Sequence, residues 1–178
     1  IRRFSAAARR RTGAEAILEY SIRREAILHM KRIFIDGSAG TTGLRIRERL
    51  AAREDVSHVT LPEPLRKDPD ARRNALNACD AAFLCLPDDA AREAVGFLDN
   101  PDVIVLDTST AHRTEPGWTY GFPELSGGCP EAVRKSRRIA VPGCHASGFL
   151  SLAAPLTAAG LLPKTALLTC TSLTGYSG

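Results

Sequence analysis

Short, continuous apolar runs that alternate with amphipathic stretches are the feature that most restricts how this chain can fold. Residues 81–86 (AAFLCL) carry no charged side chain and are bounded by Asp80 and Pro87, which is typical of a strand buried on both faces. The same reasoning predicts strands at 33–35, 56–61, 103–106 and 138–141. Helix-like spacing over 44–51 and 88–98 lies between them. The alternation predicts an α/β fold with a parallel sheet covered by helices on both sides.

The charge of the chain is concentrated at its beginning. Of 24 Lys and Arg and 20 Asp and Glu residues, the first 29 positions hold seven Arg and three Glu, which leaves 17 of each sign for the rest. The basic character therefore gives no indication of nucleic-acid binding by the folded part. No run of about 18 apolar residues is present, so we expect no membrane span.

Residues 1–29 are expected to lie outside the fold as a basic leader. Met30 is the only methionine, and the KRIFIDG sequence after it reads like an opening strand. We interpret the leader as an over-extended translation start. The alternatives are a tag remnant, a solvated basic helix and a mitochondrial transit peptide. A transit peptide is considered because residues 1–13 are rich in Arg, Ser and Ala and lack acids.

The five cysteines show neither C-x-x-C spacing nor metal-ligand spacing with the four histidines, so no metal site is predicted. Their odd number and the lack of a secretory signal favour free thiols and a cytoplasmic location. Cys79, Cys85 and Cys170 lie in or beside apolar runs and are expected to be inert. Cys129 is expected to be exposed in a turn.

A glycine-rich loop follows the first predicted strand and precedes the first predicted helix. Its G-x-x-G-x-x-G spacing allows backbone N–H groups to approach a pyrophosphate at the helix N-terminus. The alternative is a glycine-rich turn that binds nothing. The predicted cofactor-binding residues are Gly37, Ser38, Ala39, Gly40, Thr41, Thr42 and Gly43.

Charged residues after the second predicted strand bear on which nucleotide would bind. Arg66 and Lys67 would accept a 2′-phosphate and favour NADP, whereas Glu63 would hold a ribose hydroxyl and leaves the choice open. A solvated basic loop is the alternative interpretation.

Cys144 differs from the other cysteines in its position. A predicted strand, Pro142 and Gly143 precede it, and an amphipathic segment begins with it. Cys144 therefore lies at a predicted helix N-terminus. The unpaired N–H groups there would stabilise a thiolate and could also hold an oxyanion, so Cys144 is a candidate nucleophile. The alternative is a buried thiol in a strand–helix turn. His145 is adjacent and would not face Cys144 on a helix.

A polar segment, DTSTAHR (107–113), follows another buried strand at the edge where parallel sheets bind ligands. Its small hydroxyls and the guanidinium of Arg113 suit an oxyanion or phosphate group. A hydrogen-bonded polar loop is the alternative.

Together these motifs resemble N-acetyl-gamma-glutamyl-phosphate reductase, specifically its shorter type 2 branch. FLCLPDDAA, STAHR and YGFPEL are long and idiosyncratic, so the match is specific, and it covers the chain from about Met30 onward. The segments that carry it are IFIDGSAGTTGLRIRERL (33–50), RKD (66–68), AAFLCLPDDAAREAV (81–95), LDTSTAHR (106–113), GWTYGFPEL (117–125), VPGCHASGF (141–149) and TGYSG (174–178).

The resemblance implies NADPH-dependent reductive dephosphorylation of N-acetyl-glutamyl 5-phosphate to the 5-semialdehyde in arginine biosynthesis. Cys144 would be the nucleophile that forms a thioester, and Ser147 and Gly148 would lie near the nicotinamide. Ser109 and Arg113 would recognise the acyl phosphate. A homo-oligomer is expected for the full-length protein.

The resemblance also implies a domain division. We expect a Rossmann-type, doubly wound NADP-binding domain over 30–141 and the beginning of an α+β catalytic and dimerisation domain over 142–178. A further strand is predicted at 167–173, and the family's acid/base histidine would lie beyond the last residue. None of His29, His58, His112 and His145 is expected to replace it, so the chain is expected to be an incomplete, inactive fragment.

Two other functions remain open from the sequence. A sister reductase would use the same chemistry on aspartyl phosphate or an amino-adipyl phosphate. A non-catalytic dinucleotide-binding module would carry an inert Cys144. A cysteine peptidase is a weaker alternative, because no His and Asn partners are evident.

Overall fold

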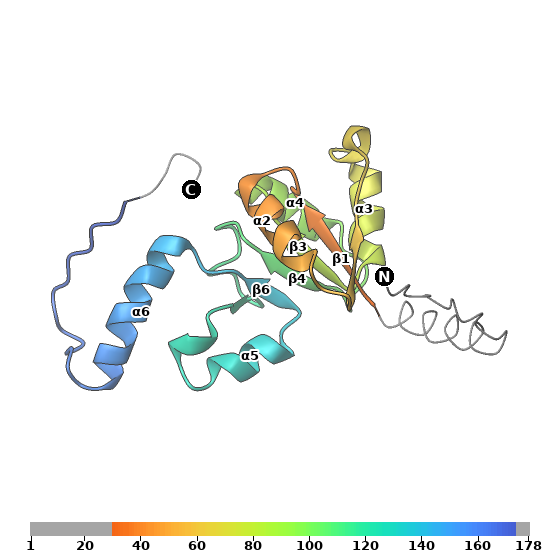
Figure 1. Ribbon diagram of the computed structural model, residues 1–178. Coiled ribbons are helices and arrows are strands. Elements are labelled where there is room, and N and C mark those ends of the chain that lie inside the picture. The colour runs from red at the N-terminus through yellow and green to blue at the C-terminus, as the bar shows by residue number, and fades with distance from the viewer. Residues whose placement is uncertain (1–29, 174–178) are drawn as a thin grey trace, which may run out of the picture. The chain divides into compact units, whose positions relative to one another are not determined.

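A six-stranded, fully parallel sheet forms the centre of the protein (Figure 1). The computed structural model describes residues 30–173, so the predictions for 1–29 and 174–178 lie outside the described residues. The strand order is β2-β1-β3-β4-β6-β5. The strands are β1 (Lys31–Asp36), β2 (Val56–Val59), β3 (Ala81–Leu84), β4 (Ile104–Asp107), β5 (Thr119–Tyr120) and β6 (Arg138–Ala140). The predicted α/β class with a parallel sheet is confirmed.

Helices connect the strands. Asp68 caps one of them by accepting a hydrogen bond of 2.7 Å from the Ala71 N–H, and Pro69 occupies its first turn, as is common at helix starts. The helices are α2 (Thr41–Leu50), α3 (Pro69–Ala78), α4 (Asp88–Gly96), α5 (Cys129–Lys135) and α6 (Cys144–Ala158), with short 3-10 turns η1 (Glu63–Leu65) and η2 (Pro123–Leu125).

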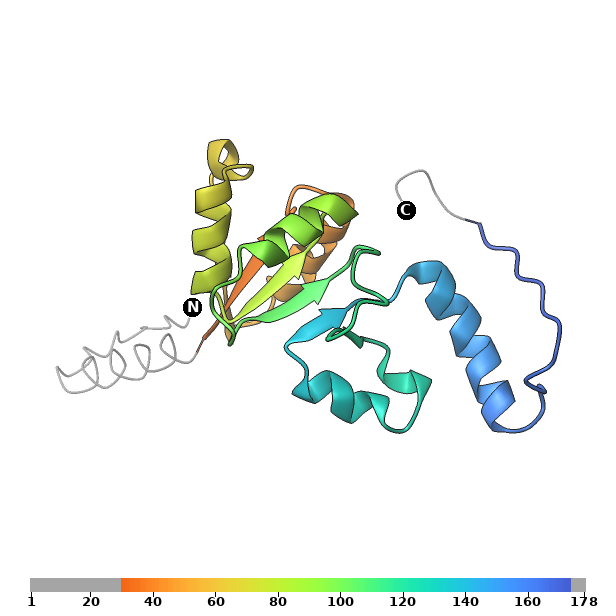
Figure 2. The ribbon, with the colours of Figure 1, turned by 180° about the vertical axis from the view of Figure 1, so that it is seen from behind.

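The core has two layers because side chains alternate between the faces of each strand. On one face, Phe34, Leu84 and Val105 pack with residues of α3 and α4. On the opposite face, Ile33 and Ile35 pack with residues of α2. Figures 1 and 2 show α2 on one side of the sheet and α4 on the other. The doubly wound arrangement is therefore confirmed.

The two crossovers next to β1 run over opposite faces of the sheet. The connection from β1 to β2 runs through α2 on one face, and the connection from β2 to β3 returns through α3 on the other. A crevice forms at the carboxyl ends of β1 and β3, where the winding reverses, and ligands of open α/β sheets bind at such a point.

The prediction of a strand at 167–173 is wrong. No residue of this segment belongs to a strand, and Leu167 is fully exposed. A strand requires backbone hydrogen bonds to a neighbour, and none of the six strands described above lies beside it. Cys170, which was expected to be an inert thiol in or beside an apolar run, is exposed in this segment.

Within residues 30–173, no helix combines the length and apolar character needed to cross a bilayer.

Candidate active site

The turn after β1 is built so that only glycine fits at its first position. Gly37 has a φ of +82°, and a Cβ there would lie 2.1 Å from the carbonyl oxygen of Cys85 in the neighbouring β3 connection. A Cβ at Gly43 would lie 2.5 Å from the carbonyl oxygen of Gly37. The first and third glycines therefore let the turn and the start of α2 pack against β3.

The N-terminus of α2 is open to an anion. Gly40 is the N-cap and provides no side-chain hydrogen bond, and the first turn has no acidic residue. Thr41 and Thr42 are exposed in that turn. Unpaired N–H groups and the helix dipole therefore favour a phosphate at this position.

A cavity of about 480 Å³ lies beside this turn, at the crevice between β1 and β3. Leu61, Leu86 and Ala90 contribute apolar surface, and Arg66 and Lys67 contribute positive charge. Glu63, in contrast, does not line it. Its residues are Phe34, Ile35, Asp36, Gly37, Ser38, Ala39, Leu61, Arg66, Lys67, Arg72, Leu86, Ala90 and Glu93. An apolar slot next to a phosphate-binding turn and two cations fits a phosphorylated dinucleotide.

Three charged residues that line this cavity were not singled out from the sequence. Arg72 of α3 is only 6% exposed, and its Nε donates to Asp36 at 3.0 Å while Nη1 donates to Glu93 at 2.6 Å. Burial raises the pKa of Asp36 despite the adjacent guanidinium. Burial also opposes the charge of Arg72, but its hydrogen bonds to Glu93 and Asp36 raise the pKa of Arg72 overall.

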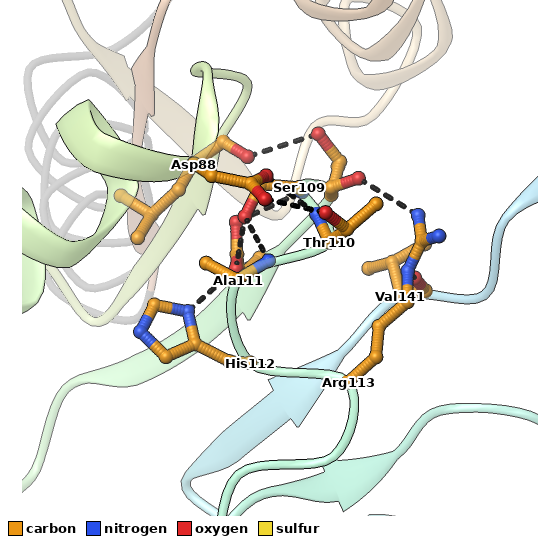
Figure 3. A network of polar contacts seen from close by, with 10 residues as sticks. Asp88, Ser109, Thr110, Ala111, His112, Arg113 and Val141 are labelled. Carbon is orange, nitrogen blue, oxygen red and sulfur yellow. Dashed lines mark hydrogen bonds and ion pairs between the residues drawn. The ribbon is translucent and has the colours of Figure 1, made fainter.

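A second polar network lies at the end of β4 (Figure 3). Asp107 is fully buried and accepts hydrogen bonds from the Ser109 N–H at 3.0 Å and the Ser109 hydroxyl at 2.6 Å. It also pairs with His112 Nδ1 at 2.7 Å, and the His112 ring stacks on Trp118 with centroids 4.2 Å apart. Ser109 is itself buried, so its hydroxyl holds the loop in shape rather than projecting toward a ligand.

The same loop is tied to the start of α4. The carboxylate of Asp88 accepts hydrogen bonds from the backbone N–H and the hydroxyl of Thr110. These two bonds lower the pKa of Asp88. Helix α4, which lines the 480 Å³ cavity through Ala90, and the 107–113 loop are thus fixed to each other.

Arg113 bridges this loop and the one after β6. Its Nε donates to the carbonyl of Val141 and its Nη2 donates to the carbonyl of Thr108, both at 3.2 Å. Its Nη1 faces Gly143, where an added Cβ would lie 2.6 Å away. The guanidinium is therefore held directly beside the residue that precedes Cys144.

Cys144 is the first residue of α6 and is exposed, which excludes the alternative of a buried thiol. Ser147, in the next turn, donates its hydroxyl to the Gly143 carbonyl at 2.9 Å. A Cβ at Gly148 would meet nothing within 4 Å, so there is open space beside this position. His145 contacts the Ser172 hydroxyl.

The other thiols contrast with Cys144. Burial raises the pKa of Cys79 and of Cys85 to about 11, consistent with the inert character expected of both. Cys129 is half-buried as the first residue of α5, where its sulfur contacts the Ser126 hydroxyl at 3.2 Å, so its predicted exposure is only partial. Among residues 30–173, no cluster of three or more His, Cys, Asp or Glu side chains is arranged to hold a metal.

The structure brings some predicted site residues together and leaves others apart. The Gly37 turn, Arg66 and Lys67 share one cavity. Cys144 and Gly148 line a different groove, of about 540 Å³, between α6 and residues 168–172. Both groups follow the carboxyl ends of parallel strands, so they lie along the same edge of the sheet.

Comparison with known proteins agrees with this architecture. The family model described as "Semialdehyde dehydrogenase, NAD binding domain" matches residues 29–135. Solved structures of similar fold include aspartate semialdehyde dehydrogenase II from Vibrio cholerae, with a TM-score of 0.54 and 18% identity, covering 73% of this chain and 47% of that one. Another is aspartate semialdehyde dehydrogenase from Francisella tularensis, with a TM-score of 0.55 and 14% identity, covering 74% and 42%.

Curated relatives are closer in sequence. A Burkholderia cenocepacia protein named N-acetyl-gamma-glutamyl-phosphate reductase is 53% identical over 82% of this chain and 47% of its own length. A Pseudomonas putida protein named N-acetyl-gamma-glutamyl-phosphate reductase 2 is 52% identical over 85% and 48%. The chain thus spans about half the length of these relatives. The resemblance identified from the motifs is confirmed.

Proposed function

The chain belongs to the semialdehyde dehydrogenase family through its NAD-binding domain, and on that premise we propose a specific reaction for the full-length protein. The reaction is the NADPH-dependent conversion of N-acetyl-glutamyl 5-phosphate to N-acetyl-glutamate 5-semialdehyde and inorganic phosphate, in arginine biosynthesis. Relatives that are about half identical carry the name of this reductase, which supports the choice of substrate. The observation that carries the proposal is the exposed Cys144 at the N-terminus of α6, with Arg113 fixed beside it.

Cys144 acts as the nucleophile in this proposal. Its thiolate attacks the acyl carbon, a C–S bond forms, and the C–O bond to the phosphate breaks with release of inorganic phosphate. The backbone N–H groups of the first turn of α6 can stabilise the thiolate and the oxyanion that develops during attack. The product on the protein is a thioester, which is more readily reduced than a carboxylate.

Arg113 recognises the phosphate group of the substrate. Two of its nitrogens are fixed by the carbonyls of Val141 and Thr108, so the guanidinium is already oriented before a substrate arrives. Ser109 donates its hydroxyl to Asp107, and this hydrogen bond helps to hold the loop that carries Arg113. We therefore assign Ser109 to positioning the loop and Arg113 to the direct contact.

The cavity between β1 and β3 holds the nucleotide. The 37–43 turn receives the pyrophosphate, and Arg66 and Lys67 bind the 2′-phosphate, which favours NADPH over NADH. We assign Ser147 and Gly148 to the nicotinamide end of the cofactor, and the open space that Gly148 leaves beside α6 supports this assignment. When bound, NADPH supplies the hydride that reduces the thioester, and the Cys144 thiolate leaves as the aldehyde forms.

The proton donor of the reaction lies outside residues 30–173 in this proposal. His112 is buried and held by Asp107, His58 is on β2 far along the sheet, and His145 contacts Ser172. The matched region is 47% of the length of a relative named as this reductase, and we assign the proton donor to the remaining part of the full-length protein. We also propose a homo-oligomer, since α6 leaves apolar side chains such as Leu152 exposed.

Selective alkylation of the full-length protein tests the nucleophile. At pH 6.5, iodoacetamide should label Cys144 first, with loss of reductase activity in proportion. Cys144→Ser should abolish the release of phosphate from the acyl phosphate in the absence of NADPH, whereas Cys129→Ser should retain it. Labelling of Cys144 no faster than a free cysteine, with activity retained, would favour a dinucleotide-binding module without catalysis.

Substrate comparison tests the choice of acyl phosphate. The full-length protein should show a much larger kcat/KM with N-acetyl-glutamyl phosphate than with aspartyl phosphate. The reverse preference would assign the protein to a sister reductase with the same chemistry.

A further inference from the structure

Two of the five cysteines face one groove. All five lie within residues 30–173 and carry free thiols, and only Cys144 and Cys170 among them are exposed. Both line the groove of about 540 Å³ between α6 and residues 168–172. Burial raises the pKa of the Cys79 and Cys85 thiols to about 11, and Cys129 lies elsewhere in the fold, at the start of α5. The groove therefore brings together the two thiols that solvent reaches most easily.

The segment that carries Cys170 returns toward the start of α6. Figures 1 and 2 show residues 161–173 running back along the helix. Near the end of this segment, the Ser172 hydroxyl contacts the ring of His145, the residue after Cys144. Side chains two positions apart in an extended segment point to the same side. Cys170 therefore faces α6 as Ser172 does, and it lines the groove together with Cys144.

Few interactions hold this segment in one position. Among the described residues, 167–173 make no backbone hydrogen bond, and their one side-chain hydrogen bond is the contact between Ser172 and His145. A disulfide requires the two Cα atoms to come within about 4.4–6.8 Å of each other. The segment can move to that distance without breaking a hydrogen bond of the sheet, because it is not part of the sheet.

We propose that Cys144 and Cys170 form a reversible disulfide when the protein meets a peroxide, and that Cys170 is the resolving thiol that protects Cys144. The order of the two steps rests on the proposed function, in which the N-terminus of α6 favours the Cys144 thiolate, so that Cys144 reacts first. The inference adds a modification site to that function and does not depend on which acyl phosphate is the substrate.

A peroxide is the oxidant in this chemistry. The Cys144 thiolate attacks one peroxide oxygen, the O–O bond breaks, and the sulfur is oxidised to a sulfenic acid as hydroxide leaves. The Cys170 thiol then attacks that sulfur, an S–S bond forms, the S–O bond breaks, and the oxygen leaves as water. Without Cys170, further peroxide oxidises the sulfenic acid to a sulfinic acid, which thiol reductants do not reverse. The exposed disulfide, in contrast, is open to attack by a small thiol.

Treatment of the full-length protein with hydrogen peroxide, followed by peptide mapping without reduction, tests the disulfide directly. The unmodified protein should yield two peptides joined through Cys144 and Cys170 and should lose its reductase activity. Dithiothreitol should then separate the peptides and restore roughly all of the lost activity.

Two variants test the role of Cys170. Cys170→Ser should have the activity of the unmodified protein before treatment, because this position is exposed and takes no part in the proposed reaction. After treatment it should regain less than about a tenth of its activity with dithiothreitol, since Cys144 is then oxidised beyond the sulfenic acid. Cys129→Ser is the matched control and should lose and regain activity as the unmodified protein does.

The peptide map and the activity are separate readouts. Joined peptides in a full-length protein without reductase activity would support the disulfide and overturn the proposed function alone. An active protein that gives no joined Cys144 and Cys170 peptides would overturn the disulfide and leave the proposed function intact. Equal recovery of Cys170→Ser and the unmodified protein would overturn the protective role of Cys170. The peptide map of the unmodified protein decides the matter even if Cys170→Ser fails to fold.

Discussion

The guanidinium of Arg113 lies directly against the backbone of Gly143, the residue before Cys144. A Cβ at Gly143 would come within 2.6 Å of Nη1 and 3.1 Å of Cζ. The contact joins the loop after β4 to the loop after β6, so the proposed phosphate-binding group and the proposed nucleophile are placed by one interface. The φ of Gly143 is −78°, which any residue can adopt. Glycine therefore suits this position because of the limited space beside Arg113 and not because of its backbone conformation.

Gly143→Ala should separate activity from stability. The atoms displaced belong to the far end of a flexible side chain, so we expect the free energy of unfolding to change by less than about 1 kcal/mol. The guanidinium must move, however, and misplacement of about 1 Å at a reacting centre can lower the rate roughly 100-fold. Urea denaturation and kcat/KM of the full-length protein measure the two effects. Gly96→Ala is the control, because a Cβ there meets nothing within 4 Å; equal kcat/KM for both variants would contradict the prediction.

Gly37→Ala should be much more destabilising than a change at another glycine of positive φ. Gly117 has a φ of +85° and open space around it, so Gly117→Ala should show only the conformational cost of about 1–2 kcal/mol. Gly37→Ala adds a backbone clash at 2.1 Å with Cys85 and should lose a further 1–3 kcal/mol or so. Chemical denaturation of both variants gives the difference. Similar losses in the two would show that the turn can move away from β3.

Asp107→Asn should destabilise the protein although it preserves size. In either orientation the Asn NH2 group would face donors that Asp107 now accepts from, either the Ser109 N–H at one oxygen position or the Ser109 hydroxyl and His112 Nδ1 at the other. Leaving these groups unpaired in a fully buried site should reduce the free energy of unfolding by about 1–3 kcal/mol. Asp102→Asn, at an 84% exposed side chain, should change it by less than about 0.5 kcal/mol. Thermal unfolding compares them, and a stability of Asp107→Asn equal to that of the control would refute a structural role for the network.

Asp88 should contribute to stability in a pH-dependent way. The hydrogen bonds from Thr110 lower its pKa from the ordinary value of 3.8, so the folded state favours the ionised form. That contribution is fully present above about pH 4 and is lost as the pH falls through the lowered pKa. Thr110→Val removes the hydroxyl donor, so the stability difference from the unmodified protein should shrink toward pH 2. Denaturation curves between pH 2 and 6 test this, with Thr114→Val, at an exposed position, as the control.

Strands β1 to β4, β6 and the start of α6 could be predicted because their signals are local, whereas the two-residue strand β5 was not predicted. The apolar run of β3 is bounded by a charge and a proline, and the Pro142-Gly143 sequence marks the turn before Cys144. The Asp68-Pro69 pair is an equally local helix signal, and α3 was missed because its buried face includes Arg72 beside Ala75 and Leu76. An arginine on the buried face makes the helix lack the apolar periodicity by which an amphipathic helix is predicted.

The charged cluster and the last segment could not be predicted because they depend on distant partners. Asp36 and Arg72 are 36 positions apart, and Glu93 is a further 21 away, so no spacing rule joins them. The composition of residues 167–173 suits a strand, but a strand also requires a neighbour to pair with. Burial of Ser109 likewise follows from the contacts of Asp107 and not from its own sequence surroundings.

The parallel sheet has a practical consequence for handling this protein. Asp102 and Arg137 lie at the opposite, amino ends of the strands, away from the Gly37 turn and Cys144. A fluorophore or surface tether attached at Asp102 would therefore leave the Gly37 turn and the Cys144 region unobstructed. This edge of the sheet is thus a suitable attachment site for binding measurements on immobilised protein.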